Sequence, residues 1–191
     1  MRNIIGKLRI VEGDATDPQK TTPNEIVIIP HVCNNRNRWG AGFVKALSVK
    51  DKTPEICYRS MFNPIPAPNN DRNMLGRVSF ATLGSASYYE HGTEIKKCSS
   101  HIYVANMIAQ DGTGRDDEPE IPLRYNSLVV CMSKVREWII SRQSKSSNSY
   151  VIHCPKFGSE LSKGKWEFIL ELIREQWLEH GIDVVVYEFK E

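Results

Sequence analysis

The chain alternates between short apolar runs and longer segments in which apolar residues recur every three or four positions. The apolar runs predict strands. They cover residues 7–11, 26–30, 78–86, 101–108, 150–155 and 182–189. The amphipathic segments predict helices over 125–140 and 165–180, and a shorter helix is expected from residue 42, continued beyond Pro54. Strands that alternate with helices are typical of α/β proteins, so we expect a three-layer α/β/α sandwich with a central, largely parallel or mixed sheet.

Each of the two long amphipathic segments carries one apolar stripe that should face the sheet. The stripes are Leu128, Cys131, Val135 and Trp138 in the first segment and Trp166, Ile169, Ile173, Gln176 and Trp177 in the second. Gly181 follows the second stripe and is a typical helix stop. Prolines and asparagines in residues 63–73, and glycines and acidic residues in 111–123, predict loops, with a polar bridge at 94–100.

Length and composition indicate an ordinary globular protein. The 191 residues are expected to form a single domain, 1–191, with 40% apolar and 25% charged residues. The formal charge of +2 is too small to indicate nucleic acid as a partner by itself, and none is expected. No apolar run reaches membrane-spanning length, and no signal-peptide core is present, so no membrane contact is expected. The five cysteines form no C-x-x-C pair, which argues against a disulfide framework and favours a cytoplasmic location.

Residues 31–42 connect a predicted strand to a predicted helix and contain the strongest candidate chemistry. Such loops point backbone N–H groups at one spot, where anions bind. The loop has neither a Walker pattern nor a full G-x-G-x-x-G. The Asn34 amide suits a ribose hydroxyl or a positioned water, and Gly40 and Gly42 let the backbone approach phosphate. A helix cap plus a turn is the alternative for this loop, and His31 is either a proton donor or a structural residue.

Three further loops follow predicted strands and should reach the same edge of the sheet. Asp14 is either an acceptor for an amine such as that of adenine or a turn residue. Residues 154–166 form a second glycine- and serine-bearing loop that can complete a diphosphate cradle, and its lysines alternatively are solvated surface groups. In the loop that follows residues 106–110, Arg124 contacts phosphate or, as we favour, anchors the loop.

These segments together resemble the macro domain (macrodomain) family, in particular its bacterial and phage branch associated with ADP-ribose-1''-phosphate processing. The matching pieces, in order along nearly the whole chain, are GDAT at 13–16, HVCN at 31–34, WGAGF at 39–43, ANMIAQ at 105–110, RY at 124–125 and PKFGS at 155–159 through Trp166. The resemblance implies a mixed sheet between helices and a cleft for ADP-ribose. Asp14 would meet the adenine amine and Asn34 the distal ribose, and the 40–42 and 157–161 backbones would hold the diphosphate.

The resemblance also implies a set of site residues. The ligand-contacting set is Asp14, Ala15, Asn34, Trp39, Gly40, Ala41, Gly42, Phe43, Phe157, Gly158, Ser159, Glu160 and Leu161. Asn34 and His31 are the candidate catalytic residues, with Glu160 or the substrate's own phosphate as other candidates for the acid or base. Glu160 stands where this branch often has glycine, which places a carboxylate near a diphosphate. Some relatives that remove ADP-ribose from protein glutamate use an aspartate where this chain has Ser162 and a lysine in the region of Gln110, so a covalent lysine mechanism is not supported.

The function that we expect on these grounds is hydrolysis of ADP-ribose-1''-phosphate to ADP-ribose and phosphate, with Asn34 orienting the ribose or the attacking water. No cofactor and no metal are expected, since the sequence shows no cluster of ligating residues. Three alternatives stay open. The cleft removes ADP-ribose from protein or nucleic acid, it binds ADP-ribose or a related nucleotide without turnover, or the chain is another kind of α/β nucleotide-binding module.

Overall fold

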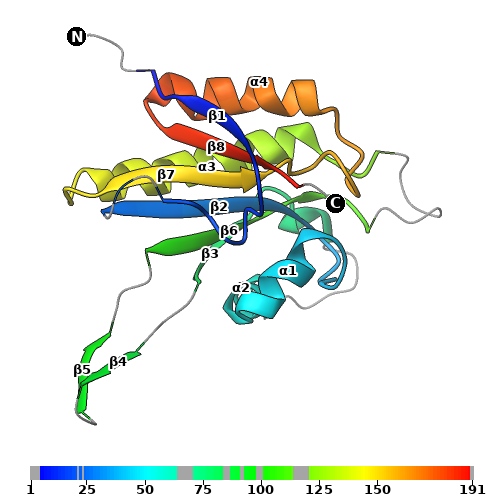
Figure 1. The fold of residues 1–191 in the computed structure, drawn as a ribbon. Coiled ribbons are helices and arrows are strands. Elements are labelled where there is room, and N and C mark those ends of the chain that lie inside the picture. The colour runs from blue at the N-terminus through cyan, green and yellow to red at the C-terminus, as the bar shows by residue number, and fades with distance from the viewer. Residues whose placement is uncertain are drawn as a thin grey trace.

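The computed structural model describes residues 5–20, 22, 24–63, 71–83, 87–90, 93–97, 101–113 and 121–189 (Figure 1). The strands are β1 (Leu8–Glu12), β2 (Glu25–Asn34), β3 (Val78–Thr82), β4 (Ser87–Glu90), β5 (Thr93–Lys97), β6 (Ile102–Gln110), β7 (Ser149–Pro155) and β8 (Asp183–Glu188). The helices are α1 (Phe43–Lys50), α2 (Thr53–Ser60), α3 (Tyr125–Gln143) and α4 (Trp166–Gln176). Short 3₁₀ helices cover Asp71–Met74 and Leu178–His180.

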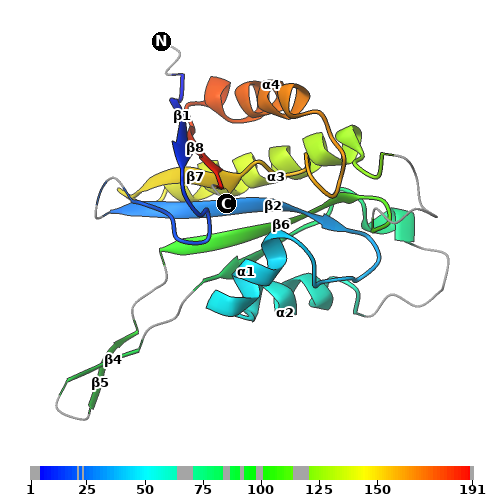
Figure 2. The same ribbon diagram turned by 45° about the vertical axis from the view of Figure 1, so that its right-hand side comes forward.

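Six of these strands form one mixed sheet in the order β1-β8-β7-β2-β6-β3. Neighbouring strands are parallel except for β3, which runs antiparallel to β6. Helices α3 and α4 lie on one side of this sheet and α1 and α2 on the other (Figure 2). The α/β sandwich with a central mixed sheet that the sequence predicts is therefore confirmed.

The central strand β2 is apolar on both faces because helices cover both. Ile26 and Ile28 pack in the cluster that includes the buried residues of α3 and α4. Val27 and Ile29 point to the other side, where they pack with Leu47 of α1. A strand that is buried on both faces reads as a continuous apolar run, which is what residues 26–30 show. Burial against two layers fixes the strand at the middle of the domain.

The second face of the sheet is not covered by helices throughout. Over β7 and β8 the cover comes from the connection that follows β1. There Ala15 packs with Val151, Val185 and Tyr187, and the backbone N–H of Gln19 donates to the Tyr187 hydroxyl. This connection therefore serves as the outer layer over β7 and β8 on this face.

Several expected boundaries differ from the structure. Strand β2 continues to Asn34, so that His31 and Asn34 belong to the strand and the loop begins after them. His31 pairs in register with Asn106 of β6, so the polar end of β2 is also part of the sheet. The expected single helix from residue 42 onward is two helices. They are separated at Asp51, whose carboxylate accepts a hydrogen bond from the Thr53 backbone N–H at 2.7 Å.

The region expected as the end of a strand and a polar bridge contains a separate two-stranded sheet. Strands β4 and β5 pair antiparallel there, while residues 84–86 and 98–100 lie outside the described residues. Of the loop expected at 63–73, residues 64–70 also lie outside them, and the 3₁₀ helix at Asp71–Met74 brings Met74 into the core.

Both long helices are present, although α4 ends at Gln176 and Trp177 precedes a 3₁₀ helix. The centres of both stripes are buried, whereas Trp138 and Trp166 are partly buried against the same cluster. Leu128, Cys131 and Val135 are buried in α3, and Ile169 and Ile173 are buried in α4. The four described cysteines are free, and Cys98 lies outside the described residues. Within the described part of the chain, no helix combines the length and the apolar character that crossing a membrane requires.

Candidate functional site

A cleft of about 790 Å³ lies at the carboxyl ends of the parallel strands. Residues that end or follow β1, β2, β6, β7 and β8 line it, because the parallel strands of one sheet all deliver their loops to the same edge. This volume is typical of a small-molecule site. The predicted residues that line the cleft are Asp14, Ala15, His31, Asn34, Trp39, Gly40, Ala41, Gly42, Phe43, Phe157, Gly158, Glu160 and Leu161. Ser159 is outside this lining, and its hydroxyl donates to the Lys156 carbonyl at 2.8 Å.

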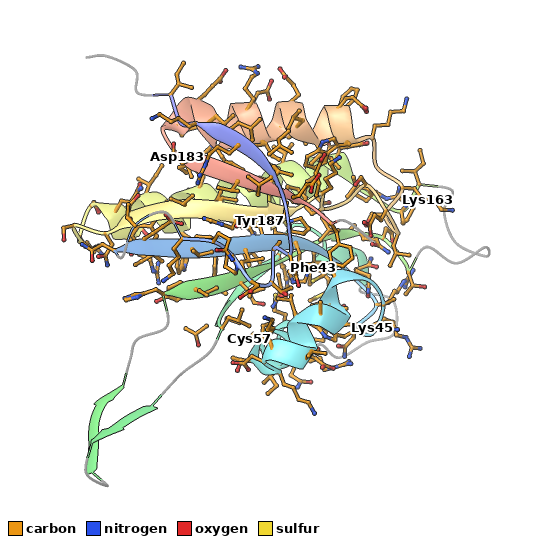
Figure 3. The ribbon with its side chains drawn as sticks, in the orientation of Figure 1. Phe43, Lys45, Cys57, Lys163, Asp183 and Tyr187 are labelled. Carbon is orange, nitrogen blue, oxygen red and sulfur yellow. The ribbon has the colours of Figure 1, made fainter. Side chains whose placement is uncertain are left out.

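The segment that follows β1, Gly13 to Ala15, lines one side of the cleft. It forms a tight turn that lies against the ring of Tyr187. The Asp14 carboxylate accepts a hydrogen bond from the Thr16 backbone N–H at 2.8 Å, so the turn interpretation of Asp14 is correct and the residue also faces the cleft. A methyl group added at Gly13 would lie 3.3 Å from the Tyr187 ring. Tyr187 and Phe43 both pack in the cluster that contains Ala15 (Figure 3). Tyr187 is a lining residue that no sequence signal singled out.

A buried hydrogen-bonded chain fixes Tyr187. Its hydroxyl accepts from the Gln19 backbone N–H at 2.9 Å and lies 2.9 Å from Nδ1 of His153. Nε2 of His153 lies 2.7 Å from the carboxylate of Glu25. The hydroxyl has one proton, so it donates to Nδ1, and Nε2–H donates to Glu25. Burial lowers the pKa of His153 even though Glu25 acts in the opposite direction, and the ring is neutral near pH 7. These hydrogen bonds connect Gln19, in the segment between β1 and β2, to side chains of the sheet.

The Asn34 side chain closes the loop that follows β2. Its Oδ1 accepts from the backbone N–H groups of Arg36 at 2.9 Å and Arg38 at 3.2 Å, and its Nδ2 donates to the Arg38 carbonyl at 2.7 Å. The Tyr58 hydroxyl lies 2.8 Å from the Asn34 carbonyl and 3.0 Å from Oδ1. The amide thus holds the loop in shape at the edge of the cleft. Contact between Asn34 and a ribose stays a prediction.

His31 lies at the floor of the cleft as a neutral, hydrogen-bonded ring. Its Nε2 is 2.7 Å from Oδ1 of Asn106, whose Nδ2 donates to the Pro54 carbonyl at 2.9 Å. Because Oδ1 is therefore the acceptor, the proton of the imidazole is on Nε2. Nδ1 lies 3.7 Å from the sulfur of Cys33. Burial lowers the pKa of His31 to about 4, so that near pH 7 its one N–H is already committed to Asn106.

The second glycine loop, residues 156–165, is closed on itself. The Gly164 N–H donates to the Gly158 carbonyl at 2.8 Å. A methyl group added at Gly164 would lie 2.4 Å from Cδ2 of Leu123 and 2.5 Å from the Gly158 carbonyl oxygen. Gly164 is thus required by close approach, a role that the sequence did not single out. A methyl group at Gly42 would lie 3.2 Å from Cδ1 of Leu161, so the two glycine loops contact each other.

A buried polar pair joins this loop to the end of β6. The Ser162 hydroxyl donates to Oε1 of Gln110 at 2.6 Å, and Nε2 of Gln110 donates to the Gly112 carbonyl at 3.0 Å. Both side chains are buried and line the cleft. Ser162 and Gln110 therefore form a neutral, hydrogen-bonded pair in the cleft.

Asp111 anchors the same edge from behind the cleft. Its carboxylate accepts from Nδ2 of Asn35 at 3.0 Å and from the guanidinium of Arg124 at 3.3 Å. Burial raises the pKa of Asp111, but these hydrogen bonds outweigh it and the pKa is lowered. Arg124 also donates to the Ile121 carbonyl at 3.0 Å. The prediction that Arg124 anchors the loop is confirmed.

No group of three or more histidine, cysteine, aspartate or glutamate side chains that could hold a metal ion occurs within the described ranges. The cleft is lined by residues of two glycine loops, by apolar and aromatic side chains, and by a few charged groups. Such a set suits an elongated ligand with both apolar and anionic parts.

The chain is similar to several solved structures. A protein of unknown function from Bacteroides thetaiotaomicron is 30% identical, with a TM-score of 0.72 over 95% of this chain and 98% of that chain. A macrodomain protein from Streptomyces coelicolor is 27% identical, with a TM-score of 0.64 over 95% of this chain and 99% of that chain. DarTG from Thermosipho africanus, solved in complex with ADP-ribose, shares the fold at 11% identity, with a TM-score of 0.58 over 96% of this chain and 42% of that chain. No protein-family model and no curated protein matches the sequence.

Proposed function

We propose, because this chain belongs to the macrodomain family, that its cleft binds ADP-ribose or an ADP-ribose derivative. The observation that carries the proposal is the close approach of the two glycine loops, Gly42 to Leu161, both of which line the cleft. Backbone N–H groups from two loops at one place suit a diphosphate. The complex of Thermosipho africanus DarTG with ADP-ribose, a structure with the same fold, supports the choice of ligand.

The ligand would extend along the cleft from the end of β1 to the end of β2. Asp14 would accept a hydrogen bond from the adenine amine, because one carboxylate oxygen serves the turn and the other is available for a ligand. The glycine loops would hold the diphosphate, and the loop closed by Asn34 would lie against the distal ribose.

Calorimetry with ADP-ribose, NAD and ATP tests the binding proposal. We expect the unmodified chain to bind ADP-ribose more tightly than either of the others. Asp14→Asn keeps an acceptor for the Thr16 N–H but replaces a carboxylate oxygen by an NH₂ group, so affinity for ADP-ribose should fall about tenfold. Asp17→Asn is the matched control, because Asp17 is exposed in the same turn and is outside the cleft lining. A chain that shows no binding of ADP-ribose would contradict the proposal.

We further propose that the cleft hydrolyses ADP-ribose-1''-phosphate to ADP-ribose and phosphate. The loop held by Asn34 would orient the distal ribose, and the N–H groups of the glycine loops would stabilise phosphate charge. His31 is neutral near pH 7 and donates its one proton to Asn106, so its contribution would be to position the floor of the cleft. The proton acceptor for water would be the substrate's phosphate or Glu160, which lines the cleft and is exposed.

Release of inorganic phosphate from ADP-ribose-1''-phosphate tests this activity. We expect release by the unmodified chain and a strong decrease in Asn34→Ala, which removes the three hydrogen bonds of the amide to the loop backbone and the one from the Tyr58 hydroxyl. If the chain binds ADP-ribose but releases no phosphate above background, the activity is refuted and the function is binding alone.

A further inference from the structure

The charged groups that line the cleft differ in whether they are already paired. Among the described lining residues these groups are Asp14, Arg38, Lys156 and Glu160. The ammonium of Lys156 lies 2.5 Å from the carboxylate of Glu188, so its charge is compensated within the protein. The guanidinium of Arg38 makes no hydrogen bond or ion pair with any residue in the described part of the chain. An exposed, unpaired guanidinium in a cleft is available to a ligand.

Arg38 has a defined place in the cleft because its backbone is fixed at two atoms. Its N–H and its carbonyl both bond to the amide of Asn34, at 3.2 and 2.7 Å. Asn34 ends β2, whereas Asp14 follows β1, and the sheet order places β8 and β7 between them. Three strand spacings correspond to about 14 Å. Arg38 and Asp14 therefore mark opposite ends of the cleft.

We propose that Arg38 recognises a phosphate group on the distal ribose, so that the cleft prefers ADP-ribose-1''-phosphate over unmodified ADP-ribose. This rests on the proposed function, in which Asp14 meets the adenine and the Asn34 loop meets the distal ribose. In that function the uncharged N–H groups of the glycine loops, which approach each other at Gly42 and Leu161, would hold the diphosphate. A further cation at the ribose end suits a further anion there, and a guanidinium binds a phosphate through two parallel hydrogen bonds.

Arg36 provides a matched control for the loss of charge. It lies in the same loop and is exposed, but it is outside the cleft lining and its guanidinium lies 3.9 Å from the carboxylate of Asp111. Arg36→Gln and Arg38→Gln remove the same charge two residues apart. Any difference between the two variants therefore reports the local contact of Arg38 and not the long-range field of the protein.

The experiment compares the affinities of the unmodified chain and both variants for ADP-ribose and for a non-hydrolysable phosphonate analogue of ADP-ribose-1''-phosphate. We expect the unmodified chain and Arg36→Gln to bind the phosphonate about tenfold more tightly than ADP-ribose. Arg38→Gln should lose this preference while its affinity for ADP-ribose changes less than about twofold. The preference should also shrink as salt is added.

Other results would overturn the inference in distinguishable ways. Equal weakening of both ligands by Arg38→Gln would assign Arg38 to the diphosphate or to loop shape. Absence of any preference in the unmodified chain would refute a phosphate site at the ribose. Absence of binding to both ligands would instead refute the proposed function itself.

A phosphate at the distal ribose can also belong to the end of a nucleic acid that carries ADP-ribose. An oligonucleotide with ADP-ribose on a terminal phosphate provides this arm of the experiment. The diester carries less charge than the free phosphate, so we expect it to bind more weakly and with a smaller loss in Arg38→Gln. Dependence on Arg38 for the oligonucleotide but not for the phosphonate would overturn the assignment to a free phosphate.

Discussion

At the scale of single residues, the loop after β2 depends on one amide and one phenol. Asn34 holds the backbone of the loop, and the Tyr58 hydroxyl in turn contacts both oxygens of Asn34. The ring of Tyr58 is fully buried and also supports Trp39, with 5.3 Å between the ring centroids. The hydroxyl of a residue outside the cleft therefore helps to set the shape of the cleft.

Removal of this hydroxyl should weaken ligand binding without removing any lining group. We expect Tyr58→Phe to lower the free energy of unfolding by about 1 kcal/mol and to reduce affinity for ADP-ribose severalfold. Urea unfolding and calorimetry measure the two effects. Tyr150→Phe is the control, because Tyr150 is similarly buried but packs against α3 and makes no hydroxyl hydrogen bond among the described residues. Equal affinity in both variants would contradict a role for Tyr58 in shaping the loop.

Sequence patterns were informative for some residues and not for others. The spacing of Asp14, Asn34 and the glycines identified the loops, because turn and phosphate chemistry is local in the sequence. The same information could not show that His31 would find Asn106 in the neighbouring strand, since that pairing depends on sheet register. The unpaired state of Arg38 likewise depends on which distant groups fold near it.

At the scale of elements, long helices and buried strands were predictable because their periodicity extends over many residues. Helices α3 and α4 and strand β2 are examples. The cover of β7 and β8 by the β1–β2 connection was not predictable, because a loop carries no periodic apolar signal. The hairpin of β4 and β5 was missed for a similar reason: its segments are short and polar.

The loop before α4 has no space for a side chain at Gly164. Gly164→Ala would place a methyl group against the Leu123 side chain and the Gly158 carbonyl, so we expect a loss of about 1 to 3 kcal/mol in stability together with loss of ligand affinity. Gly40→Ala is the comparison, because a methyl group there meets no protein atom within 4 Å and the cost is limited to the strain of its backbone, at φ 159°. Its affinity for ADP-ribose should fall with a smaller change in stability. Urea unfolding and calorimetry separate these two outcomes, and equal stability loss in both variants would contradict the packing argument.

At the scale of the whole molecule, two buried neutral histidines couple folding to pH. Burial lowers the pKa of His31 from 6.5 to about 4 and also lowers the pKa of His153. Below pH 6.5 the unfolded chain therefore binds protons that the folded chain does not, and stability falls as the pH decreases toward 4. The lowered pKa of Asp111 acts in the same direction, but only below its ordinary value of 3.8.

We expect the free energy of unfolding to fall by about 1 to 3 kcal/mol between pH 7 and pH 5. Urea unfolding across this range measures the slope. His153→Gln should be less stable at pH 7 but should show a shallower pH dependence, because one of the two histidines is removed. His180→Gln is the control, since His180 is exposed. A slope that is unchanged in His153→Gln would contradict this account.

The pairing of β1 with β8 has a consequence for the order of assembly. Leu8 pairs with Val184, and within the sheet β1 has no other neighbour. Contacts between residues this far apart in the chain form late, because a large loop must close before they gain anything. During synthesis, both glycine loops leave the ribosome before β8 does. The connection that follows β1 lacks Val185 and Tyr187, which are part of the surface it packs on, until β8 is complete. A nascent chain that ends before β8 would therefore have both glycine loops but an incomplete β1 side of the cleft. A ligand that needs both sides would stabilise only the complete fold.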